Sequence, residues 1–303
     1  MTDQLQYLEK ARMFLNELAE KPPRVPYEPE LLPMLFSATR ENSSASMDDI
    51  ARLIERSQNL ATRLLNIANS AYYVLEFKVT SLSRAISVLG LKEVRSLVLT
   101  VGMVSAIKGV KLPKTFDAHV LWMHHIRTAS FAKALTAAIQ GEAAPRQNKP
   151  ENRLSFDPDE AYVAGLLHDI GKVFLASSRP EIWQTVVDMC NTENCGFSEA
   201  EMELWGMDHG IIGSRVLHAW KVPLLLTDAI NWHHAPQLAP QGKLEAGLLS
   251  AANRLDNAGF TPGDSIGPEI MDLLPQGIDA EVLREALAER LANDRNAALS
   301  GVL

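Results

Sequence analysis

The spacing of the apolar residues is the feature that most constrains how this chain can fold. Apolar residues recur at intervals of three and four along most of the 303 residues, and no stretch keeps the every-second-residue alternation typical of a half-buried strand. The pattern therefore predicts an all-α protein. The expected helices cover residues 3–19, 28–40, 47–56, 58–70, 81–89, 91–108, 117–140, 158–178, 180–191, 198–204, 208–220, 222–234 and 243–258.

Several residues mark where helices begin or end. Ser57 and Ser81 precede apolar runs, and a serine at such a position can accept a hydrogen bond from the free backbone N–H groups of the first turn. Gly90 lies between two expected helices, where glycine ends a helix without steric cost. Two proline-containing segments, KPPRVPYEPE and GFTPGDSIGPE, interrupt the pattern. They separate a leading helix and a C-terminal stretch from the long helical middle.

Charge and composition exclude several classes of function. The chain has 29 basic and 37 acidic residues, a net charge of −8, which disfavours DNA binding because phosphate contacts need a basic face. The longest nearly apolar run, residues 97–107, is far shorter than the roughly 20 residues of a membrane span. Two cysteines, Cys190 and Cys195, suit a reducing compartment. We expect a cytoplasmic protein that neither crosses a membrane nor binds DNA.

The histidines are the residues that point to chemistry. Imidazole nitrogens and carboxylate oxygens are the ligand types that hold zinc, iron or manganese, and two adjacent metal ions can act together on a phosphate. From spacing alone, the alternative to metal binding is that these histidines only pack in the core or lie on the surface. Neighbouring histidines on a helix point in different directions, so both cannot easily face one site. Asp208 is expected to cap the helix that His209 begins. The candidate ligands are His124 or His125, His168, Asp169, His209, His233 and His234.

The order of these residues resembles that of the HD superfamily of metal-dependent phosphohydrolases. AYVAGLLHDIGKVFLA resembles its central helix, with His168 and Asp169 as the HD pair and Lys172 following. HHIRTASFAKAL resembles its first helix, in which the ligand stands three residues before an arginine, which selects His124 over His125. The resemblance implies a divalent metal centre of one or two ions: iron, zinc, manganese or nickel.

Two further segments complete this resemblance. WGMDHGIIGSRVL resembles the segment that supplies His209, and INWHHAP resembles the double-histidine segment, here His233 and His234. In relatives of the HD-GYP type the double histidine precedes a Gly-Tyr-Pro segment that helps to receive a cyclic dinucleotide. This chain has Ala-Pro-Gln-Leu there, so the resemblance disfavours hydrolysis of cyclic di-GMP.

A narrower resemblance covers about residues 30–240. The segments LLNIANS, SLSRAIS, LGL and Trp-x-His at Trp122 are similar to those of the HDOD domain, an HD-related output module of bacterial signalling proteins. The resemblance implies an HD-like helical bundle with an N-terminal helical subdomain. The expected parts are residues 1–116, in which a leading helix and proline-rich spacer occupy 1–29, then an HD-like subdomain over 117–260 and a C-terminal helical extension over 261–303.

The expected helix over residues 243–258 departs from the pattern of the HD relatives. The position of their last ligand falls on Asn253, and Asp256 matches a later aspartate that usually does not bind metal. An asparagine offers a neutral carbonyl oxygen, which is a weaker ligand for a divalent cation than a carboxylate. The resemblance thus implies one intact site at Asp169, His209, His233 and His234, and a weakened one at His124, His168, Asp169 and Asn253.

Two functional hypotheses follow from these resemblances. The first is a regulatory module that carries a metal centre and acts mainly through contacts with signalling proteins. The second is a metal-dependent phosphohydrolase or phosphodiesterase acting on a nucleotide, in which Asp169 would bridge two metal ions and Lys172 would steady the phosphate. The loss of one carboxylate at Asn253 favours the first hypothesis.

Overall fold

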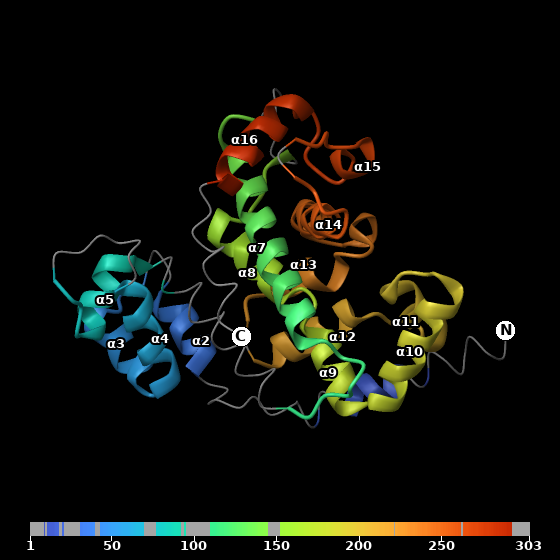
Figure 1. The fold of residues 1–303 in the computed structure, drawn as a ribbon, viewed down its shortest axis with the longest axis horizontal. Coiled ribbons are helices and arrows are strands. Elements are labelled where there is room, and N and C mark those ends of the chain that lie inside the picture. Colours follow the sequence, from blue (N-terminus) through green and yellow to red (C-terminus); the bar gives the residue numbers. More distant parts are fainter. Residues whose placement is uncertain are drawn as a thin grey trace. The chain divides into compact units, whose positions relative to one another are not determined.

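The computed structural model consists of helices and connecting loops arranged in two compact units (Figure 1). The structure describes residues 9, 11–17, 20, 31–39, 43–69, 77–91, 94, 110–144, 152–220, 222–261 and 263–292, and these contain no β-strand. The all-α prediction is therefore confirmed. Unit 1 comprises residues 1–23, 111–219 and 223–303, and unit 2 comprises 24–110 and 220–222.

Unit 2 is a group of short helices whose ends are capped by side chains. Ser57 and Ser81 accept hydrogen bonds from the backbone N–H groups of the first turns of α4 and α5, as the sequence predicts. Gly90 ends α5 with φ of 83°, a left-handed conformation that favours glycine. The expected helix over 91–108 lies almost entirely outside the described residues. The helices are α2 (Leu31–Ala38), α3 (Met47–Glu55), α4 (Gln58–Ala68) and α5 (Leu82–Leu89).

Asn69 connects α4 to the segment before α5. Its side-chain amide donates to the Val79 carbonyl at 2.8 Å, and its carbonyl oxygen accepts from the Val79 backbone N–H at 2.7 Å. An amide side chain can make both bonds because it carries a donor and an acceptor side by side. This paired bond gives the asparagine of the Ala-Asn-Ser segment a structural role.

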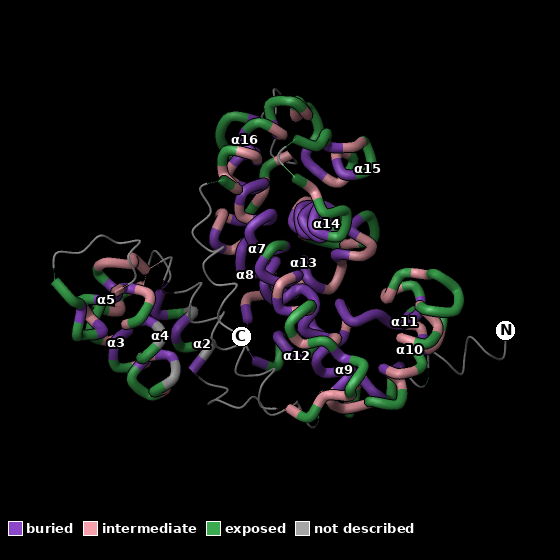
Figure 2. Tube along the Cα trace, in the orientation of Figure 1, coloured by how far each residue is buried: buried purple, intermediate pink, exposed green. Residues whose placement is uncertain are grey.

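Unit 1 holds most of the buried core. Its long helix α7 packs against α8 and α14, while α12 packs against α9 and α13. Figure 2 shows α8 and α14 buried along most of their length. The helices are α7 (Ala118–Gln140), α8 (Pro158–Leu167), α9 (Ile170–Ser178), α10 (Pro180–Glu193), α11 (Phe197–Trp205), α12 (His209–Ala219), α13 (Leu224–Trp232), η3 (Pro236–Leu238), α14 (Lys243–Asn257), α15 (Pro268–Met271) and α16 (Ala280–Ala292).

The predicted single helix over 158–178 is wrong in one respect, because the structure breaks it at His168 and Asp169. Helix α8 ends at Leu167, Asp169 takes φ −100° and ψ 10°, and α9 begins at Ile170. In a continuous helix these adjacent side chains would point about 100° apart. The break lets both of them face the same point inside unit 1.

The helical segment 11–17 and helix α16 both belong to unit 1. The ring of Phe14, in the helical segment 11–17, lies 5.1 Å from the ring of Trp205 on α11. Helix α16 packs on α7, with Leu283 and Leu287 fully buried. None of the helices that the structure describes combines the length and the apolar character that crossing a bilayer requires.

Candidate metal centre

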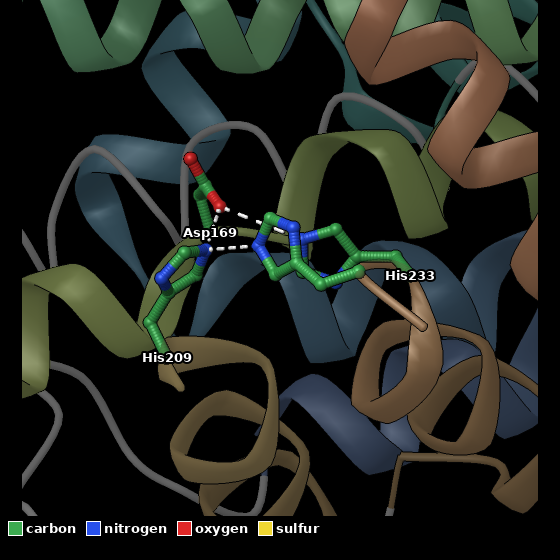
Figure 3. A group of neighbouring side chains, drawn as sticks. Asp169, His209 and His233 are labelled. Carbon is green, nitrogen blue, oxygen red and sulfur yellow. Dashed lines mark hydrogen bonds and ion pairs between the residues drawn. The ribbon is translucent and has the colours of Figure 1, made fainter. Parts of the chain in front are cut away.

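The break between α8 and α9 lies where the ends of several helices bring nitrogen and oxygen ligands together. Figure 3 shows the carboxylate of Asp169 and the imidazoles of His209 and His233 turned toward one another. Two overlapping groups share Asp169, and within each group the ligand atoms all lie within 4.8 Å of one another. One group is Asp169, His209, His233 and His234, and the other is His124, His168 and Asp169.

The helix ends position the histidines. His209 begins α12, whose first turn is capped by Asp208, since the Oδ1 atom accepts from the Ile211 backbone N–H at 3.1 Å. His233 and His234 directly follow the last residue of α13. Because the helix ends there, these two adjacent side chains can both reach Asp169, which a continuous helix would prevent.

The Nδ1 atoms of two central histidines are held by backbone carbonyls. His168 Nδ1–H donates to the Gly165 carbonyl at 2.8 Å, and His233 Nδ1–H donates to the Ile230 carbonyl at 2.7 Å. These bonds fix the neutral tautomer with a lone pair on Nε2. The two Nε2 atoms face Asp169 Oδ1, at 3.4 Å from His168 and 3.8 Å from His233.

Two other histidines are supported by carboxylates. The fully buried Glu201 of α11 accepts from His209 Nδ1 at 2.6 Å and from the His209 backbone N–H at 2.9 Å. Asp256 of α14 lies 2.6 Å from His124 Nδ1 and also accepts from Arg127. Such carboxylate–histidine pairs orient the ring and make its other nitrogen a stronger ligand. No motif in the sequence indicates this role for Glu201.

The Nε2 atoms of His209 and His124, which are the ring nitrogens not bonded to these carboxylates, lie close to other ligand atoms. His209 Nε2 lies 2.7 Å from Asp169 Oδ1 and 2.8 Å from His234 Nε2. His124 Nε2 lies 3.1 Å from His168 Nε2 and 3.4 Å from Asp169. Two ring nitrogens that face each other at such distances must share one proton or one cation, because two lone pairs repel.

The side chains fit a divalent metal ion. His233 Nε2 is a buried polar atom without a hydrogen-bond partner. Leaving such an atom unpaired costs about 1–3 kcal/mol. A metal ion would give His233 Nε2 a partner, and a donor set of imidazoles with one carboxylate suits iron, zinc, manganese or nickel.

The electrostatics of the centre favour a cation. Burial alone would lower the pKa of His209, but the carboxylates of Glu201 and Asp169 raise it to about 9. Burial and the charge of His209 lower the pKa of His233 to about 4, and burial takes the pKa of His168 and His234 well below the usual range. Without a metal, His209 thus carries a proton that a bound ion would displace.

Lys172 lies at the same carboxylate. Its ammonium nitrogen is 2.5 Å from Asp169 Oδ2 and 5.3 Å from the centre of the Phe197 ring. Burial would raise the pKa of Asp169, but His168 and Lys172 together hold it well below its usual range. The ionised carboxylate that a metal ligand requires is therefore maintained.

Two residues weighed in the sequence analysis have other partners. His125 lies outside both groups: its Nδ1–H donates to the Leu166 carbonyl at 2.7 Å, and burial lowers its pKa to about 3. Asn253 is buried, and its carbonyl oxygen accepts from the Asn257 amide at 2.9 Å. Asp256, one turn further along α14, contacts the centre through His124.

Replacing Glu201 with Gln is expected to weaken metal binding about 10–100-fold, the usual effect of removing a carboxylate behind a histidine ligand. Glutamine can still accept the bond from His209 but lacks the charge that strengthens its Nε2 atom. Competition with a chromophoric chelator for Mn²⁺ and for Zn²⁺ measures the affinity. Glu203→Gln, at an exposed position on α11, is the matched control. Equal affinities for both variants would contradict a supporting role for Glu201.

Comparisons with known proteins identify the family of this chain. The HDOD domain model matches residues 25–236. An uncharacterized protein of Treponema pallidum (strain Nichols) is 27% identical over 216 residues, which is 70% of this chain, and the match covers 39% of that protein. The chain thus spans about two fifths of the length of this curated relative.

Solved structures share the fold over nearly the whole chain. An HDOD domain protein of unknown function from Geobacter sulfurreducens has a TM-score of 0.72 at 25% identity, over 97% of this chain and 99% of that one. A protein from Marinobacter aquaeolei VT8, provisionally named a signal transduction protein, has a TM-score of 0.70 at 25% identity, over 95% of this chain and 60% of that one. Since the family model matches well over half of the residues, the chain belongs to the HDOD family.

Proposed function

We propose that this protein is a cytoplasmic regulatory HDOD module, in which a divalent metal ion held at Asp169 stabilises the helical unit and contacts with signalling proteins carry the function. The observation that supports this most is the burial of the centre. Five of the six candidate ligands, namely His124, His168, Asp169, His209 and His233, are each 9% exposed or less, and His234 is half-buried. A catalytic metal needs an open ligand position that its substrate can reach, whereas a structural metal does not.

The neighbourhood of the centre supports the same assignment. The ammonium group of Lys172 pairs with Asp169 and leaves its side chain only 18% exposed, so it is already engaged within the protein. On the His124 side, the carboxylate of Asp256 pairs with His124 Nδ1 and with Arg127. The ligand set around His124 is weakened, because Asn253 stands where relatives have a carboxylate. This favours a metal ion with a structural role and disfavours a reaction that needs two metal ions.

Turnover measurements on metal-loaded protein test the proposal. The chain would be loaded with Mn²⁺, Zn²⁺ or Fe²⁺, its metal content measured, and then given p-nitrophenyl phosphate, bis(p-nitrophenyl) phosphate and the common nucleotides. We expect at least one metal ion per chain and turnover far below the roughly 1 per second at the low end for enzymes. Asp169→Asn protein corrects for contaminating phosphatases. Turnover near 1 per second that this variant loses would contradict the regulatory assignment.

A nucleotide phosphohydrolase is the second candidate, and the paired metal groups at Asp169 favour it. In that function a bound metal would supply Lewis-acid chemistry, Asp169 would hold it, and Lys172 would contact the phosphate. Lys172→Ala would then lower turnover while leaving metal content unchanged. The same turnover measurements distinguish the two candidates.

A further inference from the structure

We propose that unit 1 contains a second binding site, which takes an uncharged, largely apolar molecule with aromatic rings and one carbonyl group. The site is a pocket of about 600 Å³ between the helical segment 11–17, the first two turns of α10 and the end of α11. Ligand pockets in proteins usually have volumes of about 300–1,000 Å³. None of the candidate metal ligands lines this pocket, so the inference goes beyond the proposed function.

The wall formed by segment 11–17 is anchored to the rest of unit 1 by Phe14. Its ring is buried and lies 5.1 Å from the ring of Trp205 at the end of α11. The guanidinium of Arg179, which stands between α9 and α10, lies 5.1 Å from the centre of the Phe14 ring and donates a hydrogen bond to Glu17. A ring contact, a cation–π contact and an ion pair thus hold the walls of the pocket together.

The lining of the pocket is largely apolar. Phe14, Ile182, Leu204 and Trp205 contribute aliphatic and aromatic groups from all three walls. A lining of this kind favours a ligand that buries apolar surface on binding. Aromatic rings bury much apolar surface at a small cost in conformational freedom, and they pack favourably against other rings. We therefore assign aromatic rings to the body of the ligand.

The charged groups of the pocket disfavour a charged ligand. Arg179 is the one cation in the lining that the structure describes, and it pairs with Glu17. A nucleotide or another anion would have to break this pair, and it would also meet the negative charge of Glu20. Because Glu20 is exposed, water screens its attraction for a cation. An uncharged molecule meets neither obstacle and gives up no ion pair.

Trp205 determines which polar group the ligand carries. The residue is only 4% exposed, and its indole N–H has no hydrogen-bond partner among the residues that the structure describes. An indole N–H can only donate, so the missing partner must be an acceptor. A buried donor without an acceptor is unfavourable. A carbonyl group on the ligand supplies the acceptor without adding a charge.

Benzophenone and diphenylmethane are the probes that test the proposal. Both have two phenyl rings, which a carbonyl group joins in the first and a methylene group in the second. Ligand-observed NMR on the full-length protein measures the dissociation constants. We expect benzophenone to bind with a dissociation constant below about 1 mM, and about fivefold more tightly than diphenylmethane because of the added hydrogen bond. Failure of benzophenone to bind would overturn the proposal, and equal affinities would overturn the assigned class of ligand.

Filling the pocket should abolish this binding. Thr185 lines the pocket from an exposed position on α10, and its hydroxyl donates to the Glu181 carbonyl within the helix. Thr185→Trp is expected to place a large ring in the pocket and to weaken benzophenone binding at least about tenfold. Thr192→Trp is the matched control, because Thr192 is also exposed on α10, donates to the Asp188 carbonyl and does not line the pocket. Unchanged binding in Thr185→Trp protein would show that the probe binds elsewhere.

Trp205→Phe tests the hydrogen bond itself. Phenylalanine keeps an aromatic ring beside Phe14 but has no N–H group. We expect this variant to lose the fivefold preference and to bind both probes with similar affinity. A circular dichroism spectrum with native helical content shows that the variant is folded, and the comparison of the two probes in the native chain does not depend on it. A preference for benzophenone that persisted in the folded variant would contradict the role of Trp205 in recognising the carbonyl group.

Discussion

Replacing Asp169 with Asn is expected to remove metal from both ligand groups at once, with a loss of affinity of more than about 100-fold. Asp169 is the residue that the two groups share. Asparagine keeps the size of the side chain but has one neutral oxygen, which binds a divalent cation more weakly than a carboxylate. It also leaves the charge of Lys172 uncompensated next to the centre, which repels a cation. Elemental analysis of protein purified without a metal-affinity tag measures the loss.

Asp208→Asn is the matched control for this substitution. Asp208 is also buried and adjacent to His209, but it caps α12 and belongs to neither ligand group. Asparagine is as good a helix cap as aspartate, so we expect this variant to keep its metal. A circular dichroism spectrum with native helical content shows that each variant is folded. If Asp169→Asn protein retained native metal content, the assignment of Asp169 as the shared ligand would be wrong.

Much of the fold could be predicted from sequence, because helix formation follows from local apolar spacing and caps. The break at His168 and Asp169 could not, since AYVAGLLHDIGKVFLA has uninterrupted helical periodicity. The break depends on contacts that come from elsewhere, namely α12 against α9 and α7 against α8. Local periodicity carries no information about those contacts.

The candidate site shows the same limit. Spacing marks individual histidines, and the order of the motifs groups them, so the sequence alone predicts these residues. The segment FSEAEMELW contains three glutamates, and nothing in its pattern distinguishes Glu201 from Glu199 or Glu203. Glu201 is distinguished from the other two glutamates only by the position of α11, which places its carboxylate at His209. Likewise, the contact between Asp256 and His124 joins residues 132 positions apart, a separation over which sequence patterning does not act.

Replacing Gly171 with Ala is expected to destabilise unit 1 by about 3 kcal/mol or more, beyond the 1–3 kcal/mol of ordinary overpacking. A Cβ atom at this position would lie 1.9 Å from the His209 carbonyl oxygen and 2.9 Å from the Gly213 backbone nitrogen. Both are backbone atoms, which cannot rotate away, so α9 and α12 would have to separate. The higher helix propensity of alanine, about 1 kcal/mol, is too small to compensate.

Gly263→Ala is the control, because a Cβ atom there meets nothing within 4 Å. Urea denaturation followed by circular dichroism should give a large fall in unfolding free energy for Gly171→Ala and a change within about 1 kcal/mol for the control. Since α12 carries His209 and α9 follows Asp169, their separation also lengthens the distance between two ligands. Metal affinity should therefore fall together with stability in Gly171→Ala protein. Native stability in that variant would contradict the close contact of α9 with α12, and with it the geometry that joins Asp169 to His209.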